Sequence, residues 1–305
     1  MGTPEFSVAP LKALAARDDF EISLVVTQPD RPKGRGKKLA FSPVKEVALD
    51  LGIPVYQPEK INTDEGFDTL SQYDVDYFVV VAFGQILSQR ILDIPRVYPI
   101  NIHASLLPKY RGASPIQAAV INMDKDAGVT TMVMAKAMDA GDILLMDSAP
   151  LDPDETASQL HDRLTEMGGD LIVSTIDQIN ADTLTPTPQD HDKATYVGML
   201  KKQDGAINWD RTPNEIRAHI NAMTPWPGAF THLDGKRLKV FKVTPRNEDP
   251  QAAPGTIFRC DNDGIHVAAK NGSVCITSLM GSSGKRLAAD AYLRGHQIPT
   301  PSRFE

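Results

Sequence analysis

A carboxamide and an imidazole stand two residues apart in NIHASLLPKYRGASPIQ, the segment from residue 101 to residue 117. Asn101 and His103 follow the apolar run VYPI, and residues two apart along a β-strand face the same side. Later in the chain, MDAGDIL places Asp139 and Asp142 around a glycine. An amide NH₂ and an imidazole N–H suit the stabilisation of an oxyanion, and a carboxylate can orient the imidazole and accept protons through water. These residue types indicate acyl-transfer chemistry.

The chain carries no motif for an activated serine or cysteine nucleophile. GxSxG is missing, and Cys260 and Cys275 lie in the other half of the sequence. The remaining histidines lack metal-ligand spacing, so we expect no metal. The residues therefore favour direct acyl transfer, in which no acyl group is held on the enzyme. The spacing alone also fits a structural alternative, an asparagine that caps a turn beside a hydrogen-bonded histidine.

The elements that must position these groups alternate between apolar strands and helices. Strands are predicted over residues 20–26, 77–82, 97–103 and 128–134, and helices over residues 42–52, 114–123 and 155–179. The first two helices each begin with a serine in capping position before a proline. This alternation predicts an α/β domain with a mostly parallel sheet, which binds ligands at the carboxyl ends of its strands. Asn101 and His103 lie at such an end.

The composition of the chain changes near residue 182. Residues 182–203 are rich in Pro, Thr and Asp and show little periodicity, which is typical of a linker. A helix is predicted over 214–223, followed by short strand candidates that the turn signals DG, DNDG and NG separate. We therefore expect a catalytic domain over 1–181, a linker over 182–203 and a small antiparallel β-barrel over 204–305.

Composition and charge argue against several classes of protein. The 305 residues carry a formal net charge of −7, so the chain is no general nucleic-acid coat. No apolar run is long enough to span a membrane, and the N-terminus lacks the pattern of a signal peptide. Two cysteines without a CxxC motif suggest a reducing compartment. We expect a cytoplasmic protein with no membrane partner.

One short segment is strongly basic in this otherwise acidic chain. DRPKGRGKKL, residues 30–39, contains two glycines, which leave the backbone mobile. The P-loop pattern GxxxxGK[ST] is missing. The concentration of charge predicts a polyanionic partner, although a solvated charged turn has the same spacing. Its five cationic side chains are Arg31, Lys33, Arg35, Lys37 and Lys38.

NIHASLLPKYRGASPIQ and MDAGDIL together resemble the formyltransferases that use 10-formyltetrahydrofolate. This pattern alone also admits glycinamide ribonucleotide formyltransferase, sugar-amine formyltransferases and the hydrolase module of formyltetrahydrofolate dehydrogenase. Further segments narrow the resemblance to the methionyl-tRNA formyltransferase family, and they extend it over nearly the whole chain. These segments are MGTPEF, VVTQPDRPKGRGKKL, VVVAFGQIL, GASPIQAAV, INWD, MTPWPGAF and APGTI.

The resemblance implies a fold and a reaction. A Rossmann-like catalytic domain, with a mostly parallel sheet, would precede a small OB-like β-barrel that binds tRNA. The formyl group of the co-substrate 10-formyltetrahydrofolate would pass to the α-amine of methionine on initiator methionyl-tRNA. The product would be N-formylmethionyl-tRNA for translation initiation. The resemblance implies no metal or nucleotide cofactor, and we expect a monomer.

The resemblance also assigns catalytic roles. Asn101 and His103 would stabilise the developing oxyanion. Asp139 would orient and charge the imidazole and help to move the proton of the amine through water. The loop VAFGQIL and the backbone near Asp139 would help to form the pterin pocket.

Binding roles follow from the same resemblance. It places the segment 30–39 at the acceptor end of the tRNA. A second basic set in the barrel either follows the tRNA backbone or solvates a strand face; its members are Lys236, Arg237, Lys239 and Lys242. The residues assigned to the folate are Ser105, Leu106, Leu107 and Pro108.

Two alternatives to this function stay open. A sugar-amine or purine-pathway formyltransferase would share the chemistry, although the basic segment and the barrel argue against it. In the family, MGTPEF follows a short apolar strand, the first of the central sheet, which this sequence lacks. We expect a start codon assigned too far downstream, so that the upstream sequence encodes an apolar run in frame. If the strand is truly missing, the alternative is a catalytically inactive tRNA-binding relative.

Overall fold

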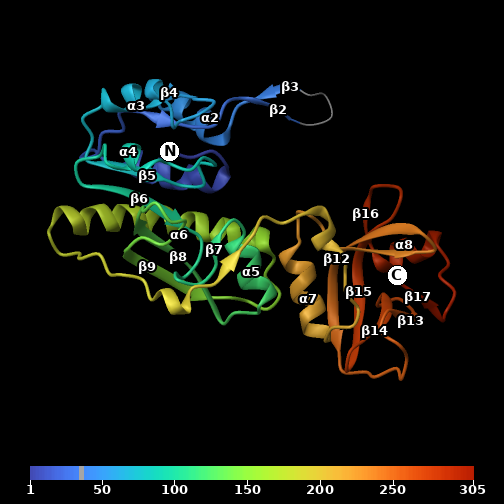
Figure 1. Ribbon diagram of the computed structural model, residues 1–305. Helices are drawn as coiled ribbons and strands as arrows, with labels where there is room; N and C mark the ends of the chain where they lie inside the picture. Colours follow the sequence, from blue (N-terminus) through green and yellow to red (C-terminus); the bar gives the residue numbers. More distant parts are fainter. Residues whose placement is uncertain (34–37) are drawn as a thin grey trace. The chain divides into compact units, whose positions relative to one another are not determined.

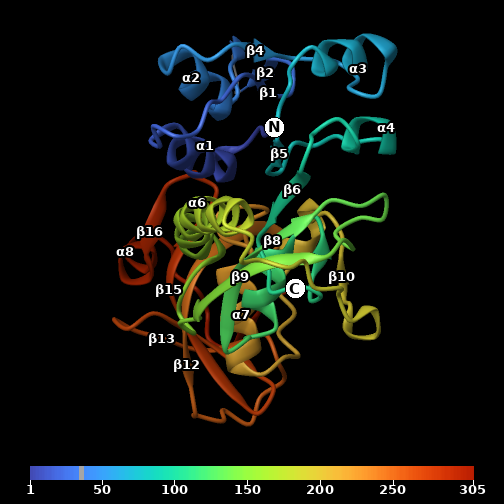
Figure 2. The same cartoon turned by 90° about the vertical axis from the view of Figure 1, so that its left-hand side faces the viewer.

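The candidate residues lie on a four-stranded sheet in the computed structural model, which describes residues 1–33 and 38–305 (Figure 1). β5 runs parallel to β6, whereas β8 runs antiparallel to β6 (Figure 2). His103 is the last residue of β6, and Asn101 lies two positions earlier on the same face. In order across the sheet, the strands are β5 (Tyr77–Val80), β6 (Tyr98–His103), β8 (Asp126–Val133) and β9 (Ile143–Pro150).

A separate pair of parallel strands, β1 (Val25–Val26) and β4 (Val55–Tyr56), lies across a gap from β5. Met1 and Gly2 bridge this gap. The Gly2 N–H donates to the carbonyl of Val26 at 3.0 Å, and the Val81 N–H donates to the carbonyl of Met1 at 2.9 Å. The parallel sheet is therefore continued across the gap by two residues, and it is interrupted beyond them.

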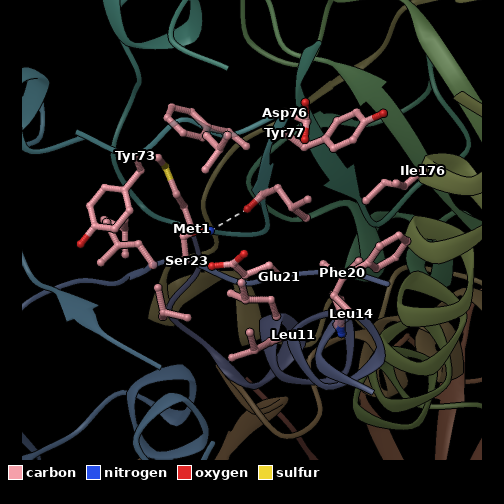
Figure 3. Close-up of a pocket in the computed structure, with 18 of the residues that line it drawn as sticks. Met1, Leu11, Leu14, Phe20, Glu21, Ser23, Tyr73, Asp76, Tyr77 and Ile176 are labelled. Atoms are coloured by element: carbon pink, nitrogen blue, oxygen red, sulfur yellow. Dashed lines mark hydrogen bonds between the residues drawn. The ribbon is translucent and has the colours of Figure 1, made fainter. Parts of the chain in front are cut away.

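A cavity of about 460 Å³ lies beside Met1 (Figure 3). Its walls include Leu11 and Leu14 of the first helix, together with Phe20 and Ile176. The Met1 amino group donates to the carbonyl of Val79 at 2.6 Å, and burial lowers the pKa of this group to about 5. The amine is therefore neutral at pH 7. The strand expected ahead of residue 1 stays a prediction.

The helices of this region begin where the sequence supplies capping groups. α2 (Pro43–Asp50) follows Ser42, whose hydroxyl accepts the Lys45 N–H at 3.1 Å, as the Ser-Pro pair predicted. α3 (Asp64–Ser71) follows Thr63, whose hydroxyl accepts the Gly66 N–H at 3.1 Å. These bonds satisfy N–H groups that have no partner within the helix.

α6 (Ala157–Asn180) packs against β6 and β8 (Figure 2). The hydroxyls of Thr131 on β8 and Thr175 on α6 share a buried hydrogen bond of 2.8 Å. Gly168 brings α6 close to Ile102, because a Cβ added there would lie 3.3 Å from that side chain. Ile102 thus faces α6, and the alternation along β6 turns Asn101 and His103 to the opposite face.

Several shorter elements complete the chain as far as Val197. β2 and β3 form an antiparallel hairpin, and β7 pairs in parallel with β10. The 3₁₀ helices are Glu5–Ser7 and His191–Lys193. The other elements are α1 (Val8–Ala15), β2 (Arg31–Lys33), β3 (Lys38–Ala40), α4 (Gln89–Leu92), β7 (Arg111–Gly112), α5 (Pro115–Ile121) and β10 (Tyr196–Val197).

The chain after Gly198 forms an antiparallel sheet that curls into a nearly closed barrel, with the strand path β11–β12–β15–β14–β13–β17. The C-terminal residue approaches the other end of this path, because the Glu305 N–H donates to the carbonyl of His232 at 3.0 Å. The elements are the 3₁₀ helix Lys202–Gly205, α7 (Pro213–Ala222), β11 (Phe230–Leu233), β12 (Lys236–Arg246), β13 (Thr256–Cys260), β14 (Ile265–Ala269), β15 (Gly272–Met280), β16 (Arg286–Ala288), α8 (Ala289–Gly295) and β17 (Ser302–Arg303).

The chain divides into two compact units. The first comprises Met1–Pro115, Asp126–Ala149 and His161–Val197, and the second comprises Ile116–Lys125, Pro150–Leu160 and Gly198–Glu305. The predicted fold class, a Rossmann-like α/β domain followed by a small barrel, is confirmed. The strand predicted over 20–26 is shorter than expected, because β1 covers its last two residues and residues 20–24 line the cavity. None of the helices in the described ranges is long and apolar enough to cross a membrane.

Candidate active site

His103 and Asp139 meet at the end of β6. His103 is 6% exposed, and its Nε2 lies 2.9 Å from the carbonyl of Tyr110, to which Nε2–H donates. The other ring nitrogen, Nδ1, lies 3.7 Å from Oδ2 of Asp139. The fold therefore brings together two of the three predicted catalytic residues, although they are 36 positions apart in the sequence. The gap is longer than a direct hydrogen bond, so Nδ1 can still donate to or accept from a third group.

The oxygen of Asp139 that faces His103 is also held by the backbone. Its Oδ2 accepts the N–H of Gly112 at 2.8 Å. Asp139 itself has a φ of 50°, in the left-handed region that residues other than glycine seldom occupy. The turn that carries this carboxylate therefore needs support from its surroundings.

Asn101 lies at a fixed register position on β6, opposite Val80 on β5 and Met132 on β8. Both neighbouring strands fix its backbone, and it is partly buried. Its side chain lies on the same strand face as His103. The placement fits the predicted role of an amide donor beside the imidazole.

The residues predicted to contact folate form a loop after β6 that is held by its own hydrogen bonds and by Thr130 of β8. The Ser105 hydroxyl donates to the carbonyl of Lys109 at 2.6 Å, and the hydroxyl of Thr130 donates to the carbonyl of Ser105 at 2.6 Å. The Leu107 N–H donates to the same threonine hydroxyl at 3.2 Å, and the Leu107 side chain is buried. Leu106 and Pro108 are partly exposed. The side chains of Ser105 and Leu107 thus stabilise the loop from within.

A buried arginine network behind Asp139 was not predicted from the sequence. The Arg111 guanidinium donates to Oε1 of Gln189 from Nε at 3.1 Å and from Nη2 at 2.6 Å. Nε2 of Gln189 donates to the carbonyl of Asp139 at 3.0 Å and to that of Gly141 at 2.7 Å. Gln189 belongs to residues 182–203, whose composition predicts a linker. Its composition gave no signal of a role in a site, because the partners come from distant segments.

The pairing of β7 with β10 places the later part of residues 182–203 beside the site. The Arg111 N–H donates to the carbonyl of Thr195 at 2.8 Å, and the Ala113 N–H donates to that of Val197 at 2.9 Å. Gly112 between them has a φ of 111°, and a Cβ there would lie 2.3 Å from the carbonyl oxygen of Val197. A glycine is therefore required where the N–H turns toward Asp139.

The predicted tRNA-contacting segment falls only partly within the described residues. Arg31 is exposed on β2, and the backbones of Lys33 and Lys38 pair across the β2–β3 hairpin. Arg35 and Lys37 lie outside the described residues. In the second basic set, Lys236, Arg237 and Lys242 are exposed on β12.

No cluster of three His, Cys, Asp or Glu side chains that could hold a metal ion occurs within residues 1–33 and 38–305. The site combines an imidazole and an amide at the end of β6 with a carboxylate from the turn between β8 and β9. These groups can donate to an oxyanion and accept a proton from an amine.

Similar solved structures share this architecture. An N-formyltransferase from Helicobacter canadensis, solved with folinic acid and dTDP-3-aminofucose, has a TM-score of 0.69 and 20% sequence identity. The match covers 90% of this chain and 96% of that chain. HypX from Aquifex aeolicus, solved with tetrahydrofolic acid, has a TM-score of 0.58 and 17% identity, covering 81% of this chain and 44% of that chain. At these identities the likeness extends to the fold.

Sequence comparison is more specific. Residues 1–176 match the formyl transferase family, and residues 199–297 match the formyl transferase C-terminal domain. The methionyl-tRNA formyltransferase of Geobacter sulfurreducens is 45% identical over 304 residues, which cover 100% of this chain and 95% of that protein. That of Clostridium novyi is 44% identical over 303 residues, covering 99% and 97%. The chain therefore belongs to the methionyl-tRNA formyltransferase family.

Proposed function

We propose that this protein transfers the formyl group of 10-formyltetrahydrofolate to the α-amine of methionine on initiator methionyl-tRNA. The observation that carries the proposal is the pairing of His103 with Asp139 at the end of β6. The similarity to methionyl-tRNA formyltransferases, which extends over the whole of this chain, supports it. The donor is a folate, and the 10-formyl form is the one that the resemblance implies.

The reaction divides into two steps around a tetrahedral intermediate. The amine nitrogen attacks the formyl carbon, and the carbonyl oxygen gains negative charge. The bond from that carbon to the folate nitrogen then breaks, and a proton passes from the amine to the folate. The products are N-formylmethionyl-tRNA and tetrahydrofolate. No oxidant, reductant or metal enters this balance.

His103 and Asn101 act on the oxyanion in this mechanism. Nε2–H of His103 is committed to the carbonyl of Tyr110, so Nδ1 is the nitrogen that faces the reaction. When Nδ1 is protonated it donates to the oxyanion, together with the amide of Asn101. Asp139, 3.7 Å away, stabilises the charged imidazole and accepts the proton of the amine through water.

The folate would lie against the loop of residues 105–108. Hydrogen bonds within the loop and to Thr130 of β8 keep the loop in one shape, so its backbone and the partly exposed Leu106 and Pro108 would present a preformed surface to the pterin. A preformed surface suits a flat, rigid ligand, because little conformational entropy is lost on binding.

An assay with 10-formyltetrahydrofolate and charged initiator tRNA tests the reaction. We expect formylation by the native chain, and a fall in kcat of about 10²–10³ for His103→Ala and for Asn101→Ala, as for the loss of one oxyanion donor. Folate affinity should be largely kept in both variants. The matched control is His161→Ala, which removes an imidazole from α6. Near-normal turnover of His103→Ala would refute the assignment.

We infer that the basic segment 30–39 binds the tRNA backbone. Replacing Arg35 and Lys37 with alanine should weaken tRNA binding by about 1–3 kcal/mol and flatten its salt dependence, because fewer counterions are released. Folate affinity should not change. The matched control removes the same charge from two exposed lysines elsewhere, Lys12 and Lys60. If tRNA affinity depended on salt in the same way for the native protein and both variants, the segment would be a solvated charged turn and the inference would be wrong.

A further inference from the structure

The guanidinium of Arg111 is buried without a carboxylate among its hydrogen-bond partners in the described part of the chain. Arg111 is 2% exposed. Its nitrogens contact Oε1 of Gln189, Nδ1 of His191 at 3.0 Å and the hydroxyl of Tyr196 at 3.2 Å. Burying a charge among neutral groups costs free energy, because the charge loses its contact with water.

The partners of Gln189 fix the orientation of its amide. A guanidinium can only donate, so the atom that faces Arg111 must be the carbonyl oxygen. The amide nitrogen then faces the carbonyls of Asp139 and Gly141, which can only accept. Gln189 is 5% exposed, so water does not readily replace these bonds. The arginine thus sets the direction in which the glutamine donates.

The two carbonyls belong to the turn that carries the Asp139 carboxylate. The left-handed φ of Asp139 needs support, and Gln189 supplies it at the carbonyl of that same residue. The other contact of the carboxylate, the Gly112 N–H, comes from the residue next to Arg111. Asp139 is therefore held at two points: Gln189 binds its backbone carbonyl, and the residue next to Arg111 binds its carboxylate.

We propose that Gln189, oriented by Arg111, is a positioning residue that holds Asp139 in place beside His103. Gln189 does not touch the reacting atoms, and it acts through the backbone of Asp139. This inference rests on the proposed function, because the rate it affects is that of formyl transfer. It gives the segment between the two matched family regions a part in the catalytic geometry.

Gln189→Glu separates positioning from stability. The new carboxylate keeps an acceptor for Arg111 and gains an ion pair with it. It also places an acceptor where the amide nitrogen stood, 3.0 and 2.7 Å from two carbonyl oxygens. We expect kcat to fall at least about tenfold, since a displacement of about 1 Å can cost about 10²-fold. KM for both substrates and the melting temperature should change little.

A matched control makes the same chemical change elsewhere. Gln178 lies on α6, where its amide donates to the hydroxyl of Ser174 at 3.2 Å. Gln178→Glu should keep the native kcat. A second variant, Gln189→Met, removes the acceptor for Arg111 as well, and it should lower both kcat and the melting temperature. If Gln189→Glu kept the native kcat while Gln189→Met lost kcat and stability together, the role would be structural and the inference overturned.

A double-mutant cycle tests whether Gln189 acts through Asp139. In an Asp139→Asn background, single-turnover measurements at high enzyme concentration should show no further fall in rate when Gln189→Glu is added. Independent, multiplicative losses would overturn the inference.

The same experiment separates this inference from the proposed function. If the native chain did not formylate methionyl-tRNA, or if Asp139→Asn kept the native rate, the function or the catalytic assignment would fail. If both of those controls behaved as expected and Gln189→Glu had no effect, only the positioning role would be rejected.

Discussion

At the scale of single residues, the distance between His103 and Asp139 matters as much as their meeting. At 3.7 Å the two side chains attract each other electrostatically without a direct hydrogen bond. A closer pair would tie Nδ1 to the carboxylate and leave the imidazole no free nitrogen, because Nε2 already contacts Tyr110. The observed spacing leaves one nitrogen for the substrate or for a water molecule.

Gly112 gives a direct test of how narrowly this geometry is set. Gly112→Ala would place a Cβ 2.3 Å from the carbonyl oxygen of Val197, at a φ of 111° that alanine resists. We expect the pairing of β7 with β10 to separate, with a loss of roughly 1–3 kcal/mol in unfolding free energy and at least a tenfold loss of kcat. Urea unfolding and the formylation assay measure the two effects.

The control for this substitution is Gly198→Ala, since nothing lies within 4 Å of a Cβ added there. Equal stability and activity of Gly112→Ala and Gly198→Ala would show that the N–H of residue 112 does not hold Asp139.

At the scale of elements, locally encoded features were predictable from the sequence. Ser42 before Pro43 predicted the start of α2, since a cap needs only residues within one turn. The end of β6 was predicted from its apolar run and its two polar residues. Gln189 was not predicted, because its function depends on carbonyls 48 and 50 positions away, and neither composition nor periodicity encodes such contacts.

The length of β1 illustrates the same limit. Residues 20–26 have the apolar pattern of a buried strand, but only Val25 and Val26 pair with a neighbour. Strand pairing requires a partner, and residues 20–24 border the cavity instead. The two residues that pair, Val25 and Val26, are also the buried ones, whereas residues 20–24 are partly or fully exposed.

The cavity beside Met1 should accept added apolar chain in an extended conformation. The N–H groups of Val25 and Thr27 donate to carbonyls on the β4 side. The N–H of Val26, between them, therefore faces the gap. Joining Val-Ile-Val to the amine of Met1 should fill the space and raise the melting temperature by about 4 °C or more, at about 1.5–3 kcal/mol per buried side chain. Gly-Ser-Gly at the same position is the control. Equal melting temperatures for the two extensions would contradict a strand-accepting gap.

At the scale of the whole molecule, both the fold class and the family could be predicted from the sequence. The alternation of strands and helices and the later hairpin signals indicated an α/β domain followed by a barrel. The choice of Asp139 over Asp142 as the partner of His103 came from the resemblance, because the spacing alone admitted both carboxylates and a structural alternative. The network behind them required the structure, since it joins β7, the turn after β8 and the segment before β10.

The buried amine of Met1 should make the stability of the folded chain depend on pH. Its pKa falls from 8.0 to about 5 on folding, so between these values the unfolded chain binds a proton that the folded chain does not. The free energy of unfolding should therefore decrease as pH falls from about 8 to about 5, at up to ~1.4 kcal/mol per pH unit from this group. Urea unfolding at several pH values measures the slope.

The comparison for this slope is the same chain acetylated at Met1. Acetylation removes the titrating amine and keeps an N–H for the carbonyl of Val79. The acetylated chain should lose less stability between pH 8 and pH 5. Identical slopes for the two forms would mean that the amine is solvated in the folded chain.

The interruption between β1 and β5 also bears on how the first unit opens. In the described part of the chain, the ladder that joins the β1–β4 pair to the larger sheet consists of Met1 and Gly2. Separating the pair therefore breaks few backbone bonds, whereas exposing β6 requires loss of its ladders with both β5 and β8. Amide protons of β1 and β4 should accordingly exchange with solvent through a sub-global opening, while those of β6 should exchange only on complete unfolding.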